Sequence, residues 1–148
     1  MKSMYLYLLP LFVTTLSATA QVTDKSLEGR WKLVSYDDGF AIIDVEKDTW
    51  IKKDQSEGLN KTYSTRCTPY EGVVRWSRES RFEFNDGVLT ILSDGEREAK
   101  KYLLEFKDGK TYVRIEGEED VQCIYIKDGK MHYQDEKDGM QFVFAKAE

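Results

Sequence analysis

The second half of the chain alternates short apolar stretches with turn-forming clusters. From residue 80 onward, runs with an apolar residue at every second position are interrupted by Asn, Asp and Gly at intervals of about 8 to 14 residues. Such spacing is typical of a β meander, in which consecutive strands pair with each other. The clusters are Asn85-Asp86-Gly87, Ser93-Asp94-Gly95, Lys107-Asp108-Gly109, Glu116 to Asp120, Lys127-Asp128-Gly129 and Lys137-Asp138-Gly139.

The Asp-Gly pairs also predict the register of the strands. Both central residues of a type I′ hairpin turn need positive φ, which Gly tolerates freely and Asp tolerates better than most residues. A two-residue turn fixes which residues face each other, and facing residues share one side of the sheet. The predicted inner pairs are Phe82 with Ile91, Phe84 with Leu89, Tyr102 with Ile115, Leu104 with Val113, Phe106 with Thr111, Ile124 with Tyr133, Ile126 with Met131, and Tyr133 with Phe144. Four hairpins thus agree on one apolar face.

The first half of the chain is less regular. It predicts a first strand over Trp31–Tyr36, a second, bent strand formed by Phe40–Val45 and Thr49–Lys52, and a third over Lys61–Cys67. Residues 68–80 contain a Pro, a Gly and a Val-Val pair and are left unassigned. Arg97 to Leu104 has a composition compatible with a helix, but the hairpin that follows favours a strand.

The strand count favours a closed sheet. An open sheet of eight to ten strands leaves two unpaired edges, and closing it into a barrel removes them. A barrel of about eight strands can just hold one small ligand. A β sandwich is the main alternative, but it usually needs Greek-key crossovers, whereas the hairpins here are successive. The predicted fold is therefore an all-β, antiparallel up-and-down barrel of about eight to ten strands.

The first twenty residues have the pattern of a secretory signal peptide. Lys2 precedes an apolar stretch from Tyr5 to Leu16, and Ala18 and Ala20 fit an Ala-x-Ala cleavage site. The stretch is shorter than the roughly 18 apolar residues that cross a bilayer, and Gln21 offers no thiol for lipid attachment. We expect a signal peptide over residues 1–20 and one periplasmic or secreted domain over 21–148, without membrane insertion.

Charge narrows the range of partners. Residues 1–20 hold one of the 22 basic residues and none of the 27 acidic ones, which leaves the mature chain with a net charge of −6. A negative chain is a poor partner for nucleic acid or an anionic membrane surface. Acids and bases are interleaved along the sequence, as on a well-solvated surface. We therefore expect no nucleic-acid partner.

The chain contains two cysteines, Cys67 and Cys123. In an exported protein they are a possible disulfide, which would contribute roughly 4 kcal/mol to stability in the chain-entropy model. The alternative is a pair of free, half-buried thiols. Sequence alone does not decide between them, because bridging depends on the distance and direction of the two side chains.

The stretch from Leu27 to Ser35 resembles the Gly-x-Trp opening strand of lipocalins, and particularly of small bacterial lipocalin-like secreted domains. Gly29 and Trp31 match the motif. In that family a short helical turn precedes the motif and the Trp closes one end of the barrel. Residues 24–28 would supply the turn, and Lys146, on the inner side of the last strand, is the nearest substitute for the Arg that stacks on the Trp. The chain has no clear Thr-Asp-Tyr motif between later strands.

Catalytic and metal-binding patterns are weak. His132 is the single histidine, and its predicted pairing with Tyr125 places it on the outer face, which leaves no hydrolytic triad or multi-histidine site. Two distant cysteines are too few for a usual zinc site. The acidic residues from Glu116 to Asp120 lack the pattern of a calcium loop. We therefore predict no enzyme, no metal and no cofactor.

The inner face is the feature that points to a function. Aromatic side chains supply a large apolar area, and buried tyrosine hydroxyls need partners, which a ligand could provide. The predicted ligand-binding residues are Trp31, Phe82, Phe84, Tyr102, Phe106, Tyr133, Phe142 and Phe144. The leading hypothesis is non-covalent binding of a small hydrophobic or aromatic molecule inside the barrel. The alternative is a barrel with a solid core that binds another envelope or secreted protein through exposed Tyr, Trp50 or Trp76.

Overall fold

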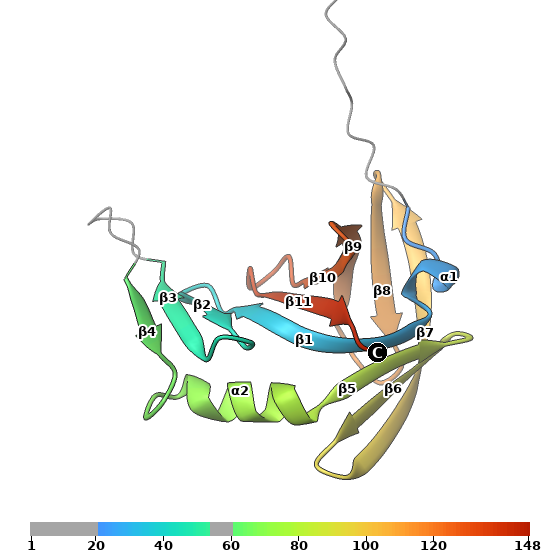
Figure 1. The fold of residues 1–148 in the computed structure, drawn as a ribbon. Coiled ribbons are helices and arrows are strands. Elements are labelled where there is room, and N and C mark those ends of the chain that lie inside the picture. The colour runs from blue at the N-terminus through green and yellow to red at the C-terminus, as the bar shows by residue number, and fades with distance from the viewer. Residues whose placement is uncertain (1–20, 54–60) are drawn as a thin grey trace, which may run out of the picture.

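The fold is a closed barrel with a three-stranded extension (Figure 1). The structure, a computed structural model, describes residues 21–53 and 61–148, so the predicted signal peptide lies outside the described residues. The helices are α1 (Asp24–Leu27) and α2 (Tyr70–Glu79), and the strands are β1 (Gly29–Asp37), β2 (Ala41–Asp44), β3 (Thr49–Lys52), β4 (Thr62–Ser64), β5 (Arg81–Asn85), β6 (Val88–Ser93), β7 (Glu96–Lys107), β8 (Lys110–Ile115), β9 (Val121–Lys127), β10 (Lys130–Gln134) and β11 (Gln141–Lys146).

Among the described residues, eight antiparallel strands form the barrel. The strand order is β11-β10-β9-β8-β7-β6-β5-β1-β2-β3-β4, and β11 also pairs with β1. This last pairing closes β1 and β5–β11 into a ring and leaves β2–β4 as the extension. The predicted all-β, antiparallel up-and-down barrel is confirmed, and residues 97–104 lie within β7 as the hairpin pattern indicated.

The Asp-Gly turns have the conformation that the sequence predicts. Asp86, Asp94, Asp108 and Asp128 have φ between 48° and 53°, and the glycine after each also has positive φ. The predicted pairs of the β5–β6, β7–β8 and β9–β10 hairpins are present, including Phe84 with Leu89. The local turn chemistry therefore sets the register of these hairpins.

The register predicted for the last hairpin is wrong by two residues. Tyr133 pairs with Phe142, and Phe144 pairs with Met131. The cause is a longer loop over residues 135–140, in which the Asp135 side chain accepts backbone hydrogen bonds from the two residues that follow Glu136. Because the shift is two residues, both phenylalanines stay on the inner face.

The first half of the chain departs further from the prediction. The predicted second strand is a hairpin of β2 and β3 that reverses near Asp48, which has a φ of 60°. The predicted third strand shortens to β4 and ends before Thr65, whose buried hydroxyl donates to the Asp48 carboxylate at 2.9 Å. These reversals build the extension instead of adding strands to the barrel.

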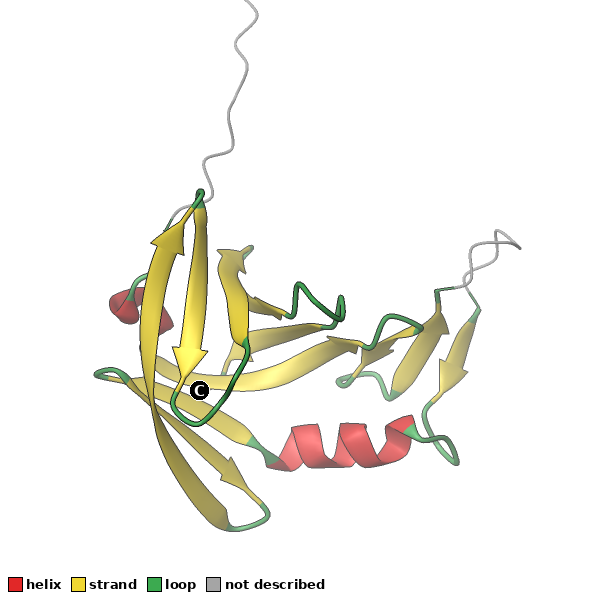
Figure 2. Cartoon of the chain, turned by 180° about the vertical axis from the view of Figure 1, so that it is seen from behind, coloured by secondary structure: helices red, strands yellow, loops and turns green. Residues whose placement is uncertain are grey.

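Residues 68–80, which the sequence left unassigned, hold the helix α2. Its Tyr70, Val74 and Ser77 follow helical spacing, and Val74 and Ser77 are buried. Gly72 and two adjacent valines weaken the helical signal in the sequence. Figure 2 shows α2 running beside the extension, where Val74 packs against Ala41 and Ile43 of β2.

Trp31 on β1 makes contacts at the place where the first and last strands of the barrel pair. Its indole nitrogen donates to the carbonyl oxygen of Leu27 at 2.7 Å, which holds α1 against the start of β1. Trp31 pairs with Lys146 of β11, whose ammonium lies 4.4 Å from the centre of the indole ring and donates to the Glu28 carbonyl. Gly29 has a φ of 115°, and a Cβ there would lie 3.1 Å from that ammonium, so a larger residue is disfavoured.

The main core lies inside the barrel and continues up to α1. It consists of Val22, Leu27, Trp31, Leu33, Val45, Phe84, Leu89, Tyr102, Val113, Ile124, Met131 and Phe144. Leu27 and Val22 come from the segment that precedes β1, and the backbone nitrogen of Val22 donates to the Thr111 hydroxyl at 3.1 Å. This end of the barrel is therefore filled by protein.

We predict that Leu27→Ala lowers the free energy of unfolding by about 2–5 kcal/mol, because it opens a cavity between α1 and Trp31. Leu27 is 0% exposed, whereas Leu103 on β7 is 72% exposed. The matched variant Leu103→Ala should change the same quantity by less than about 0.5 kcal/mol. Urea denaturation followed by circular dichroism measures both. Equal losses of unfolding free energy in the two variants would contradict the packing of α1 over this end of the barrel.

Candidate functional site

The barrel contains a cavity of about 340 Å³. Some of its lining residues are buried core residues and others are partly exposed residues of the barrel strands, and one side chain of α2 and two of the loop between β8 and β9 join them. The lining residues are Leu33, Trp76, Phe82, Phe84, Leu89, Ile91, Ile115, Glu118, Asp120, Gln122, Met131, Tyr133, Phe142 and Phe144. The cavity is thus largely apolar, with a few polar groups.

Five of the eight predicted site residues line this cavity: Phe82, Phe84, Tyr133, Phe142 and Phe144. The rings of Phe82 and Phe144 meet edge to face at 4.9 Å, and those of Tyr133 and Phe142 do so at 6.1 Å. Strands β5, β10 and β11 therefore bring these rings together, as the alternation along the chain indicated.

The other three predicted residues lie elsewhere. Trp31 and Tyr102 are buried in the core but do not line the cavity. Burial, and then a hydrogen bond with Asp24, raise the pKa of Tyr102 far above its usual value. Phe106 is 52% exposed at the end of β7, although Thr111, which it pairs with, is buried. Alternation gives the face on which a side chain lies but not its depth along the barrel, and the structure does not bring Phe106 to the site.

Trp76 reaches the cavity from outside the barrel. It projects from α2, and its ring lies 6.0 Å from that of Phe82 in an edge-to-face contact. Trp76 remains 39% exposed, so it forms part of the rim. The sequence analysis considered it only as a surface residue, because the helix that carries it was not recognised.

Gln122 supplies a polar group that the sequence analysis missed. Its side-chain nitrogen donates to a carboxylate oxygen of Asp135 at 3.2 Å. Hydrogen bonds from the backbones of Asp138 and Lys137 and from Gln122 lower the pKa of Asp135, so this carboxylate is ionised and only accepts. The amide oxygen of Gln122 therefore faces away from it, and this oxygen is buried without a hydrogen-bond partner among the described residues. Gln122 lies two residues before Ile124 on β9, and this spacing predicts that both side chains lie on the inner face.

Tyr133 is the second polar group of the wall. Burial, with smaller contributions from the charges of Glu118 and Asp135, raises its pKa to about 12. The phenol therefore stays protonated at neutral pH. A neutral phenol can both donate and accept a hydrogen bond at the cavity wall.

Glu118 and Asp120, on the loop between β8 and β9, contribute two carboxylates to the rim of the cavity. The Glu118 carboxylate lies 2.8 Å from the ammonium of Lys100, which also lies 3.3 Å from Glu98. Asp120 forms no ion pair with a described residue. The acidic loop, interpreted from sequence as simply solvated, thus contributes two residues to the cavity.

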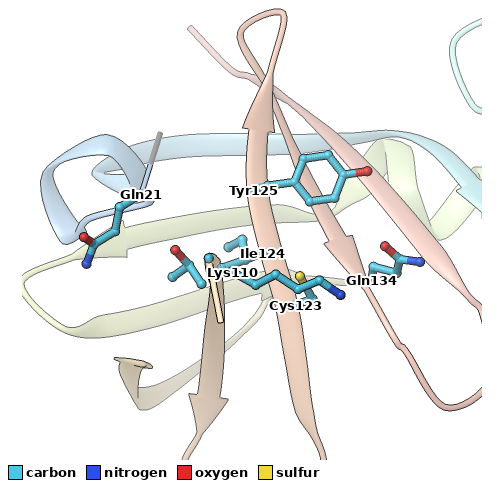
Figure 3. A pocket seen from close by; sticks show the side chains of 8 residues that line it. Gln21, Lys110, Cys123, Ile124, Tyr125 and Gln134 are labelled. Atoms are coloured by element: carbon cyan, nitrogen blue, oxygen red, sulfur yellow. The ribbon is translucent and has the colours of Figure 1, made fainter. Parts of the chain in front are cut away.

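Cys67 and Cys123 do not form a disulfide. Cys67 is exposed and Cys123 is buried, and both thiols are free. Cys123 lies on the outer side of β9, in a separate pocket of about 230 Å³ that Lys110 and Gln134 also line (Figure 3). Burial, with a smaller contribution from the charge of Glu136, raises the pKa of the Cys123 thiol, which keeps it unreactive at neutral pH.

The remaining candidates lie away from the cavity. His132 pairs with Tyr125 as predicted, and their rings stack at 4.7 Å. Trp50 packs between Tyr63 and Tyr70 in the extension. Within residues 21–53 and 61–148, three or more His, Cys, Asp or Glu side chains never gather where they could hold a metal ion. No helix in this part of the chain is long and apolar enough to span a membrane.

Over the described residues, the fold and the site define a closed, eight-stranded antiparallel barrel with a largely apolar cavity. Comparisons with protein-family models, curated proteins and solved structures found no match to the chain.

The two thiols should differ in accessibility. We predict that a maleimide reagent labels one cysteine per native chain, Cys67, and two in guanidinium chloride, because Cys123 becomes accessible only on unfolding. Mass spectrometry of the labelled chain measures this, and Cys67→Ser should abolish the native label. No labelling in either state without reductant would mean that a disulfide exists.

His132 should give the stability a pH dependence. Burial, together with the positive charges of Lys127 and Lys130, lowers its pKa in the folded chain below the usual 6.5. Between the two pKa values the unfolded chain binds more protons, so the stabilisation is complete above about pH 6.5 and is lost as the pH falls toward the folded value. Carboxylates titrate lower, near pH 4. Urea denaturation at pH 7.5 and 5.5 should show a smaller loss for His132→Gln than for the native chain, and equal losses would contradict this assignment.

Proposed function

We propose that this chain is an exported, lipocalin-like carrier that binds a small hydrophobic or aromatic molecule non-covalently inside its barrel. The observation that carries the proposal is the cavity of about 340 Å³, with six aromatic side chains in its lining. This volume lies at the lower end of the range of small-molecule sites, which are concave, mostly apolar and equipped with a few polar groups.

The Gly-x-Trp arrangement supports the lipocalin-like part of the proposal. Gly29 and Trp31 open the barrel, a helical turn precedes them, and Lys146 stacks on the indole as the resemblance implied. The predicted signal peptide supports a periplasmic or secreted location. In this reading the filled end at α1 is structural, and the cavity is the binding site.

Docking to another exported protein is a second candidate. It is favoured by Phe40, which is 80% exposed in the turn before β2, and by Ile42, which is exposed on β2 itself. Both residues belong to the extension and not to the cavity. A purely protein-binding role makes no use of the cavity, so a probe of the cavity separates the two candidates.

We predict that N-phenyl-1-naphthylamine, a neutral aromatic probe, binds saturably with one molecule per chain. Ile91→Trp should lower its affinity by at least about tenfold, because a larger side chain on the cavity wall fills the space that the probe needs. Leu103→Trp, at an exposed site, is the matched control and should leave the affinity unchanged.

The enhancement of probe fluorescence and isothermal titration calorimetry measure this binding, and circular dichroism checks the folding of both variants. A linear, non-saturating signal from the native chain would contradict the carrier proposal. The same affinity in Ile91→Trp and the native chain would place the probe outside the cavity.

A further inference from the structure

One polar group in the cavity lining is free to meet a ligand away from the rim. Five of the described lining residues carry a side-chain nitrogen or oxygen: Trp76, Glu118, Asp120, Gln122 and Tyr133. Trp76, Glu118 and Asp120 are exposed and belong to the rim, where water reaches them. Gln122 and Tyr133 are partly buried, so they are the two polar residues that lie deeper in this lining.

Gln122 has no polar atom to offer. Its side-chain nitrogen donates to the Asp135 carboxylate at 3.2 Å, and its amide oxygen is fully buried. An atom without accessible surface does not contact a molecule in the cavity unless the protein rearranges around it. Recognition of a polar group inside the cavity therefore depends on Tyr133.

The Tyr133 hydroxyl is both unpartnered and accessible. It forms no hydrogen bond with a described residue, yet it is not fully buried. Its ring packs against the main core and meets that of Phe142 edge to face at 6.1 Å on the cavity wall. Burial raises the pKa of this phenol to about 12, so its surroundings are not bulk water. The hydroxyl therefore opens onto the apolar cavity.

The deeper part of the cavity holds no charge that would pair with a charged ligand. None of the described lining residues is Lys, Arg or His, so an anion finds no cation there. The two carboxylates lie at the rim, and that of Glu118 already lies 2.8 Å from the Lys100 ammonium. Moving an unpaired charge into an apolar site costs far more than moving a neutral polar group. A neutral ligand is therefore favoured over an acid or an amine.

We infer that Tyr133 determines specificity for a neutral aromatic compound that carries one hydroxyl or carbonyl oxygen. The rings of Phe82, Phe142 and Phe144 contact the aromatic body. The Tyr133 hydroxyl donates to the ligand oxygen or, where the ligand carries a hydroxyl, accepts from it. This inference rests on the proposed carrier function, and it names the ligand's polar group and the residue that recognises it.

Three probes that share a naphthalene body test the polar group on the mature chain: naphthalene, 2-naphthol and 2-naphthoate. By displacement of N-phenyl-1-naphthylamine at pH 7, the neutral 2-naphthol should bind at least about tenfold tighter than the anionic 2-naphthoate. Equal affinities, tighter binding of 2-naphthoate, or no displacement by 2-naphthol would overturn the inference and leave the carrier proposal standing. Failure of all three probes and of N-phenyl-1-naphthylamine to bind would instead overturn the carrier proposal itself.

Tyr133→Phe tests the recognising residue, because it removes the hydroxyl and keeps the ring. It should weaken 2-naphthol binding about tenfold, since the ligand hydroxyl loses its partner in the cavity, and change naphthalene binding less than about twofold. Tyr63→Phe is the matched control, because Tyr63 is 44% exposed on β4 in the extension, and both affinities should stay unchanged. Comparing two ligands in two proteins cancels the difference in hydration between the ligands.

Equal changes of the two affinities in Tyr133→Phe, including no change in either, would overturn the inference once circular dichroism has verified the folding of the variant. A measurement on the native chain decides the matter if Tyr133→Phe misfolds. In the native complex with 2-naphthol, nuclear Overhauser effects should connect the ligand protons with the Tyr133 ring. Their absence from a saturated complex would place the ligand away from Tyr133 and overturn the inference.

Discussion

The pairing of β1 with β11 is the interaction on which the rest of the structure depends. It joins the two ends of the described chain and turns a sheet with two open edges into a closed barrel. Backbone hydrogen bonds alone would tolerate a slipped register. Trp31 fixes it, because one indole ring contacts the helix before β1 through Leu27 and the last strand through Lys146. Only in the closed ring do the inner faces of β5 and β11 meet and enclose a cavity.

The parts of this fold that sequence predicts are those that local chemistry determines. Asp86-Gly87 and the similar turns need positive φ at adjacent residues, and that requirement fixes the strand pairing on either side. The same pattern misleads at Asp138-Gly139, where the side chain of Asp135 closes a longer loop. The helix α2 was missed for a related reason. Its stability comes from packing Val74 onto β2, a contact that no local signal announces.

The candidate site likewise has residues that the sequence predicts and residues that it does not. Alternation along the strands predicts the aromatic wall, since side chains two residues apart share a face. It does not predict that Phe106 lies beyond the packed part of the barrel, because depth depends on strand tilt and length. It also does not predict Trp76 or Glu118, which come from a helix and a loop that only the folded chain places at the rim. Gln122 was predictable from its place two residues before Ile124 on β9, but the pattern of apolar residues does not include it.

The two ends of the barrel differ in what fills them, and this difference explains why a cavity exists. At the start of β1, Val22 and Leu27 supply side chains from outside the barrel and complete a dry core. On the side of α2, the partly exposed Trp76 is the one helical side chain among the described residues that reaches the cavity. The strands there supply rings that point inward, but no segment of the described chain fills the space between them. Filling this end as well would require further side chains that act as Val22 and Leu27 do at the other end, and none of the described residues supplies them.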